Sequence, residues 1–236
     1  MGAPFFSIII PTFFEGKLLR NTLESVKHQQ FEDYEILVCD YGSTDGTVQI
    51  AKEYGAKILR VNKPGASFAR NYGAINAKGK YLVFLDADTT MWPDSLSVFK
   101  QEVEKGIIAG FPLIYWATDN KFFELFRTYL INPLYYLASL LSADISYPCC
   151  DFYEKNLFLN TNGFDERTPL FTGFDLNKDL RKYGKLKLLP TVKCFTSDRR
   201  VKDFGLPAYC MTGVYAFLLK VLRNKVLPLD FYKPVR

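Results

Sequence analysis

Two aspartates separated by a single residue offer the clearest chemistry in this sequence. Asp86 and Asp88 directly follow residues 81–85, an unbroken run of five apolar side chains. A run this short and apolar is typical of a buried strand, and the ligand crevice of an α/β sheet lies beyond the carboxyl ends of its strands. Residues two apart in extended backbone point the same way, so both carboxylates would face one point. Two neighbouring anions repel unless a cation lies between them, and Mg²⁺ or Mn²⁺ bound to a diphosphate fits that requirement.

Taken alone, two aspartates at this spacing more often form a solvated acidic turn, because the motif is short and common, but polar residues at two other strand ends favour a binding site. Thr12 follows the apolar run 6–10, and Asp40 follows the run 34–39. The carboxyl ends of parallel strands lie at one edge of a sheet, and such convergence is typical of a nucleotide site. No Gly-x-Gly-x-x-Gly motif and no Walker loop follows the first strand, so the metal would have to hold the phosphates.

Apolar periodicity predicts the elements that position these residues. Short apolar runs predict strands, and apolar positions three and four apart predict helices. Strands and helices that alternate at this spacing imply βαβ units, so we expect an α/β fold with a Rossmann-like, mostly parallel central sheet flanked by helices. The predicted strands are 6–10, 34–39, 57–61 and 81–85, and the predicted helices are 16–29, 47–51, 67–77 and 93–103.

Composition bounds the class of protein. At 236 residues the chain forms one domain, or one domain with an appended element, and 48% hydrophobic against 23% charged residues exclude a disordered chain. A net charge of +5 is too small to indicate a nucleic-acid partner but fits anionic substrates or an anionic membrane surface. The five cysteines show no CxxC spacing, which indicates neither a disulfide framework nor a zinc site. The first residues lack the basic start of a signal peptide, so we expect a cytoplasmic location, with peripheral contact to the cytoplasmic membrane face as the alternative.

Several segments together resemble the family 2 glycosyltransferases of the GT-A fold. The resemblance covers roughly residues 5–200, and the order and spacing of the first four segments are more specific than any one of them. It implies a GT-A fold, a UDP- or GDP-sugar donor and a divalent metal, Mg²⁺ or Mn²⁺. The matching segments are SIIIPT at 7–12, VCDYGSTDGT at 38–47, GASFARNYG at 65–73, DAD at 86–88, NGFDE at 162–166 and GFDLN at 173–177.

The resemblance implies a role for each matching residue. Thr12 and Glu15 would lie against the nucleoside, Asp40 would hydrogen-bond the base, and Asp45 and Arg70 would lie close by. The remaining residues expected to contact the nucleotide sugar are Pro11, Ser43, Asp86, Ala87, Asp88, Arg199 and Arg200.

The same resemblance implies the reacting groups. Asp86 would face the ribose and the metal, Asp88 would bind the metal directly, and Asp175 would be the general base. One base and one cation suffice for a direct displacement, which inverts the anomeric centre. A double displacement would also need a nucleophile.

The chain departs from the family pattern around the base and the metal. Phe174 replaces an acidic residue and Asn177 replaces a second aspartate, so Asp175 has an alternative interpretation as the N-cap of a helix over 176–183. Asp151 and Asp165 are then the alternative bases. Many relatives complete the metal site with a C-terminal histidine, but His28, the only histidine here, is expected on the surface. Arg199 and Arg200 could take the diphosphate instead, or form a solvated basic loop.

The second half of the chain is less informative. We expect residues 1–110 to form the nucleotide-sugar half, 111–204 the acceptor and catalytic half, and 205–236 a C-terminal apolar and basic helix and tail. Residues 121–141 and 209–222 are strongly apolar but too short to span a membrane. They fit a core, a partner interface or interfacial helices whose basic ends meet anionic lipid.

The sequence therefore predicts a metal-dependent, inverting glycosyltransferase that acts on an acceptor glycan or lipid and needs no nucleic acid. A nucleotidyltransferase is the nearest alternative enzyme, but it would normally show a glycine-rich and basic loop after the first strand. A non-catalytic scaffold that binds lipid or protein is the alternative of another class. Metal-dependent binding of a nucleotide diphosphate separates the scaffold from the enzymes.

Overall fold

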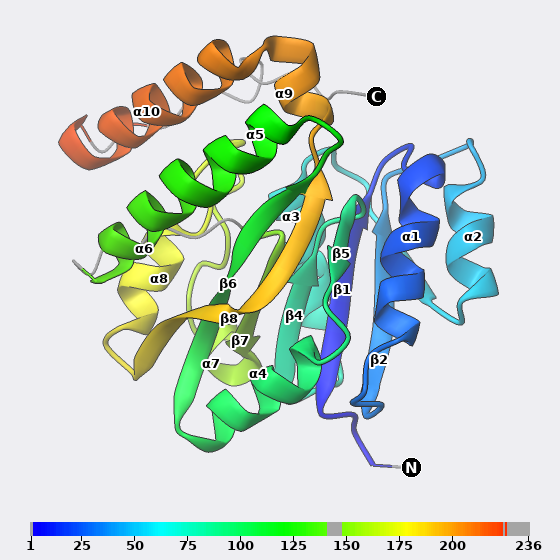
Figure 1. The fold of residues 1–236 in the computed structure, drawn as a ribbon. Coiled ribbons are helices and arrows are strands. Elements are labelled where there is room, and N and C mark those ends of the chain that lie inside the picture. Colours follow the sequence, from blue (N-terminus) through cyan, green and yellow to red (C-terminus); the bar gives the residue numbers. More distant parts are fainter. Residues whose placement is uncertain (1, 141–147, 224, 226–236) are drawn as a thin grey trace.

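The computed structural model describes residues 2–140, 148–223 and 225, and it contains one eight-stranded sheet with helices on both faces (Figure 1). The strand order is β3-β2-β1-β4-β7-β6-β8-β5. The sheet thus joins strands from both the expected donor half and the expected acceptor half of the chain. Its strands are β1 (Phe6–Thr12), β2 (Tyr34–Asp40), β3 (Lys57–Arg60), β4 (Tyr81–Leu85), β5 (Thr89–Met91), β6 (Ile107–Ala117), β7 (Cys150–Glu154) and β8 (Lys185–Ser197).

The first four strands are parallel, and every element predicted over residues 6–104 is present within two residues of its expected ends. Ile8, Ile9 and Ile10 of β1 are all fully buried, because helices cover both faces of this strand. The helices between and after these strands are α1 (Gly16–Lys27), α2 (Thr47–Glu53), α3 (Ala66–Asn76) and α4 (Ser95–Glu104).

The rest of the sheet is mixed, but the sheet stays mostly parallel as predicted, with four parallel and three antiparallel strand pairs among the described residues. β7 pairs antiparallel with both β4 and β6, β8 is parallel to β6, and β5 is antiparallel to β8. The direction of β7 depends on the path of the chain between β6 and β7. A short segment such as residues 150–154 carries no information about that path.

Two apolar cores lie on opposite faces of the sheet. One contains side chains of α1, α2 and α4, including Leu23 and Phe99. The other contains side chains of α3, α7 (Lys155–Leu159) and α8 (Phe174–Leu180), including Phe158. Successive strand residues alternate between them, as Ile8 and Ile9 do. This packing holds the carboxyl ends of β1, β2 and β4 at one edge.

A second group of helices lies at the end of the sheet toward which β6 and β8 run (Figure 1). It consists of α5 (Lys121–Phe126), a π-helical turn η1 (Arg127–Ile131), α6 (Asn132–Leu140), α9 (Arg199–Phe204) and α10 (Leu206–Arg223). Trp116 at the end of β6 contacts both Phe123 of α5 and Tyr209 of α10. No helix within the described residues is both long and apolar enough to cross a membrane.

Candidate active site

The turn between β4 and β5 holds the two aspartates close together. The Asp86 amide donates to the Cys149 carbonyl (3.0 Å), and the Thr22 hydroxyl of α1 donates to the Ala87 carbonyl (2.8 Å). Burial raises the pKa of Asp88, and the neighbouring charge of Asp86 raises it further. The structure therefore supports the prediction that the two carboxylates face one region.

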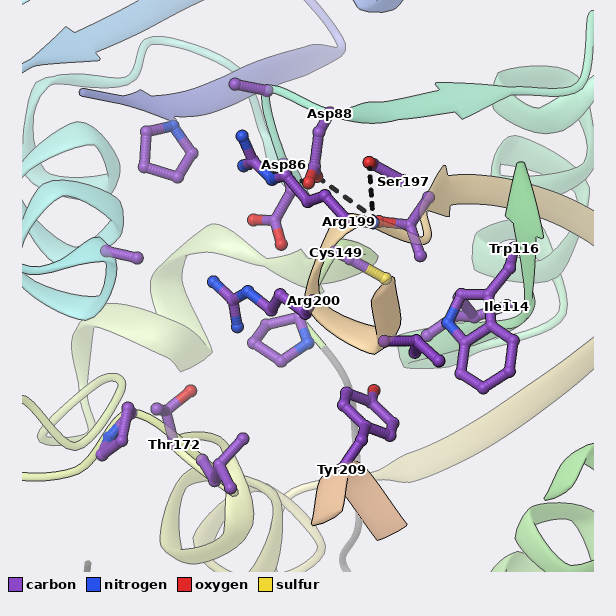
Figure 2. A pocket seen from close by; sticks show the side chains of 18 of the residues that line it. Asp86, Asp88, Ile114, Trp116, Cys149, Thr172, Ser197, Arg199, Arg200 and Tyr209 are labelled. Carbon is purple, nitrogen blue, oxygen red and sulfur yellow. Dashed lines mark hydrogen bonds and ion pairs between the residues drawn. The ribbon is translucent and has the colours of Figure 1, made fainter. Parts of the chain in front are cut away.

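Two arginines neutralise this pair. Arg70 of α3 forms an ion pair with Asp86. Arg199, the first residue of α9, lies 3.1 Å from Asp88 (Nη2 to Oδ2; Figure 2). It also donates two hydrogen bonds to Glu15, of 2.9 and 2.7 Å. Such a two-pronged contact matches the planar guanidinium to a carboxylate. Arg199 thus joins the loop after β1 to the turn after β4.

Glu15 belongs to the same electrostatic cluster. Burial raises its pKa, the hydrogen bond from Arg199 opposes that shift, and the charges of Asp88 and Asp86 add to it. With all groups ionised, the three carboxylates are balanced by three guanidiniums, those of Arg70, Arg199 and the neighbouring Arg200. A cluster of this composition can exchange an arginine contact for a metal ion and turn that arginine toward an anion.

These residues form the polar end of a pocket of about 230 Å³. Ile114, Trp116 and Tyr209 form an apolar wall across from the aspartates, and Arg200 extends between the two ends (Figure 2). A loop at residues 169–172 closes another side. Phe171 in that loop has a φ of 55°, a strained conformation for a bulky side chain that is found most often near functional sites.

The pocket brings together eight of the residues expected from the sequence. They are Pro11, Glu15, Arg70, Asp86, Ala87, Asp88, Arg199 and Arg200. The predicted residues Thr12, Asp40, Ser43, Asp45 and Asp175 do not line it.

Asp40 instead holds the loop after β2. It is 2% exposed and accepts hydrogen bonds from the Thr12 hydroxyl (3.0 Å), the Ser43 hydroxyl (2.6 Å) and the Ser43 amide (2.9 Å). The Ser43 hydroxyl in turn accepts from the Phe14 amide (2.9 Å), and Asp45 accepts from the Gly16 amide (3.0 Å). These contacts tie the loops after β1 and β2 to each other, so Asp40 has a clear structural role at the edge of the pocket.

Asp175 lies in the first turn of α8, whose N-cap is Gly173, so the alternative interpretation of Asp175 as a helix cap is wrong. Its half-exposed carboxylate accepts a hydrogen bond from Lys220 of α10 at 2.6 Å. The two alternative bases are also engaged. Asp151 is 1% exposed, and Arg167 binds Asp165 and lowers the pKa of that carboxyl.

The apolar wall was missed by sequence reasoning. The Arg127 guanidinium lies over the Trp116 ring (5.3 Å to its centroid) and donates from Nε to the Ile114 carbonyl (2.9 Å). The ring of Tyr209 meets the same tryptophan edge-on at 5.8 Å. These residues come from β6, η1 and α10, and no sequence spacing joins them. The only available signal was the aromatic richness of the two apolar segments.

The donor set fits a divalent metal that shares its shell with phosphate. Asp86 and Asp88 offer hard oxygen ligands, and Mg²⁺ commonly binds one or two carboxylates with substrate phosphates. Within the described part of the chain, no group of three or more His, Cys, Asp or Glu side chains is placed to hold a metal by itself. His28 is exposed at the end of α1, as expected, and is not among the residues that line the pocket.

Comparisons with known proteins define the class. The model of glycosyl transferase family 2 matches residues 7–160. The PGL/p-HBAD biosynthesis glycosyltransferase of Mycobacterium bovis is 38% identical over 187 residues, which are 75% of this chain and 70% of that relative. The GalNAc(5)-diNAcBac-PP-undecaprenol beta-1,3-glucosyltransferase of Campylobacter jejuni is 31% identical over 110 residues, 44% of this chain and 36% of the relative.

Two solved structures show the same fold. The mannosyltransferase PcManGT of Pyrobaculum calidifontis, in complex with GDP-Man and Mn²⁺, has a TM-score of 0.68 and 18% identity over 97% of this chain and 67% of its own. S. aureus TarS in complex with UDP-GlcNAc has a TM-score of 0.65 and 17% identity over 81% of this chain and 58% of its own. At these identities the likeness concerns the fold, which is that of the GT-A glycosyltransferases.

The fold and the site together define a protein of the glycosyltransferase class. The family match extends over more than half of the chain, and the chain belongs to the family 2 glycosyltransferases. The resemblance and the fold class predicted from the sequence are thereby confirmed. The chain spans between 27% and 58% of the length of several other curated relatives, the chondroitin synthase of Escherichia coli among them.

Proposed function

We propose that the protein is a metal-dependent, inverting glycosyltransferase that moves a sugar from a nucleotide diphosphate to a hydroxyl of a glycan or lipid acceptor. The observation that carries this proposal is the cluster of Glu15, Asp86 and Asp88 with Arg70 and Arg199 at the polar end of the pocket. Carboxylates for a cation and arginines for phosphate oxygens are the two kinds of group that a departing diphosphate needs. The donors named for the two solved relatives, GDP-Man and UDP-GlcNAc, agree with this chemistry.

Asp88 and Asp86 would hold the metal, which when bound neutralises charge that develops on the leaving diphosphate. Arg199 contacts Asp88 and Glu15. Its planar fork fits phosphate oxygens as well as it fits a carboxylate, so a bound diphosphate would compete for it. Arg70 keeps Asp86 oriented, and Arg200 adds positive charge in the centre of the pocket.

The nucleoside would lie along Pro11, beside the loops that Asp40 and Ser43 hold together. Thr12 and Asp45 stabilise these loops through hydrogen bonds and thereby shape the base-binding edge. Residues 1–110 would then supply the donor side, residues 111–204 the acceptor side, and residues 205–236 the C-terminal helix and tail.

Asp175 is our proposal for the general base. A direct displacement needs one group that takes the proton of the acceptor hydroxyl, and the half-exposed carboxylate of Asp175 is accessible to solvent and acceptor. Lys220 holds one carboxylate oxygen (2.6 Å), and the other oxygen can accept the proton. The outcome at the anomeric carbon would be inversion.

The test of the donor site is calorimetry of UDP and GDP with and without Mn²⁺. We expect one of the two nucleotides to bind in a metal-dependent manner, and Asp88→Ala to remove the metal dependence because a site with two protein ligands loses one of them. Two results would contradict the assignment of Asp88 as a metal ligand. One is a nucleotide affinity of the wild-type protein that does not change with Mn²⁺, and the other is an affinity of Asp88→Ala that still depends on Mn²⁺. A non-catalytic scaffold would show no such dependence.

A further inference from the structure

The helices α5, η1, α6 and α10 expose an unusual number of apolar side chains. Most of the large hydrophobic side chains that are exposed in the described chain belong to these helices, and Tyr129 and Met211 are 74% and 71% exposed. We call this surface the apolar face. It consists of Phe122, Leu125, Tyr129, Leu130, Leu134, Tyr136, Leu137, Met211, Val214, Tyr215 and Leu218.

On α10 the polarity is the reverse of that of an ordinary surface helix. Met211, Val214 and Leu218 are spaced three and four apart, so they share one side of the helix, and all are exposed. The inward side carries Ala216 and Lys220, both buried, and Lys220 is paired with Asp175. A helix with its charged residue buried and its apolar stripe exposed is unfavourable in contact with water.

Charges are scarce on the apolar face and abundant at its border. Between residues 122 and 140 the only charged residues are Glu124 and Arg127, and Arg127 is buried. The segment 199–225, in contrast, contains six basic residues and one acidic residue. Arg199 and Lys220 are paired within the protein, and Arg200 lines the pocket. Among the described side chains of this segment outside the pocket, Lys202 and Lys225 are exposed, and Lys202 also pairs with Asp198 at 2.9 Å.

We propose that the apolar face docks onto the surface of an anionic lipid bilayer. Apolar side chains flanked by basic residues match the acyl boundary and the charged headgroups of such a bilayer, whereas an apolar protein partner would not require the basic border. The described helices do not reach the length and apolarity of a spanning segment, so they would lie in the plane of the interface.

Docking through the apolar face would bring the bilayer close to the pocket. Tyr209 and Arg127, from the same helices, line the pocket, so one side of these helices faces the pocket and the other side faces outward. A bilayer on the outward side would be about one helix diameter, roughly 10 Å, from the pocket wall. An acceptor anchored in that bilayer could present its hydroxyl to the pocket without leaving the lipid. This consequence rests on the proposed function, but the docking itself does not.

The test is flotation of the whole protein with vesicles. One set contains equal parts of phosphatidylcholine and phosphatidylglycerol, and the other contains phosphatidylcholine alone. We expect binding to the anionic set that falls with added salt, and about tenfold or greater weakening in a Met211→Ser, Leu218→Ser variant, because two buried apolar side chains are lost from the interface. Lys202→Gln should weaken binding about fivefold, from roughly 1 kcal/mol per basic residue near the surface.

The matched control is Ile75→Ser, Leu159→Ser. These two side chains are exposed to a similar degree but lie on α3 and α7, away from the apolar face. All four serine positions are exposed, so thermal melting should change little and the comparison does not depend on folding. Equal vesicle binding by both double variants, or no binding by the wild-type protein, would overturn the proposal. A dimer seen by sedimentation that dissociates in Met211→Ser, Leu218→Ser would overturn it too, because the apolar face would then be a subunit interface.

Discussion

Replacement of Arg199 by glutamine separates metal binding from diphosphate binding, because we expect the two to change in opposite directions. Arg199 lies 3.1 Å from Asp88 and therefore competes with a divalent cation for this carboxylate. Removing the guanidinium should increase the affinity for Mn²⁺ alone. It should also weaken binding of UDP or GDP in the absence of metal, since the phosphate oxygens lose a two-pronged donor.

The size of the effect follows from the geometry. Two unit charges about 4 Å apart, at an effective dielectric constant of about 20, interact by about 4 kcal/mol. For a largely buried pair, desolvation and relaxation offset much of this interaction energy. About 1–2 kcal/mol remains by which Arg199 opposes metal binding at Asp88, which corresponds to about 5- to 30-fold in the Kd for Mn²⁺. The side chains of Arg199 and Asp88 are 21% and 13% exposed, so solvent screens this pair only in part.

The assay is Mn²⁺ titration followed by electron paramagnetic resonance, with calorimetry of the nucleotide in the absence of metal. Arg20→Gln is the control, because Arg20 is a surface arginine paired with Glu53 and is not among the residues that line the pocket. It should change neither affinity. If Arg199→Gln binds Mn²⁺ no better than the wild-type protein, Arg199 does not compete for the metal ligand and the reasoning is refuted. A lower affinity would mean that Arg199 orients Asp88 for the metal.

Three further substitutions test the site and the sheet. Asp40→Ala should lower the free energy of unfolding by about 1–3 kcal/mol in urea titration, because it leaves buried donors without an acceptor; unchanged stability together with lost nucleotide affinity would instead make Asp40 a direct ligand. Asp175→Asn should lower kcat about 10²–10⁴-fold and leave the donor affinity unchanged. The control is Asp179→Asn, also on α8. If Asp175→Asn transfers sugar at nearly the wild-type rate, Asp175 is not the base. Gly110→Ala would place a Cβ 2.2 Å from the ring of Phe152, so we expect a loss of at least about 1–3 kcal/mol, and a melting temperature equal to that of the wild-type protein would contradict this packing.

The helices and strands of the first half of the protein could be predicted from the sequence, because the residue patterns that specify them are local. A run such as residues 81–85 is apolar throughout since both faces of β4 are covered, and the polar residues that follow it mark the strand end. Parallel strands bring such ends to one edge whatever the details of packing, which is why Thr12, Asp40, Asp86 and Asp88 were expected together. Of these four residues, Asp86 and Asp88 line the pocket, and Thr12 and Asp40 do not.

Only the tertiary structure decided which side chains are partners. Arg199 reaches Glu15 across 184 residues of sequence, and this contact depends on β8 lying beside β5 and on α9 turning back over the edge of the sheet. Asp40 was expected to face the crevice, but its burial among hydrogen-bond donors follows from the shape of the two neighbouring loops. The direction of β7, the wall made by Trp116 and the outward apolar stripe of α10 likewise depend on how distant segments pack. Periodicity along the chain determines which side of a helix or strand is apolar. Which other helix or strand covers that side depends on the topology of the sheet.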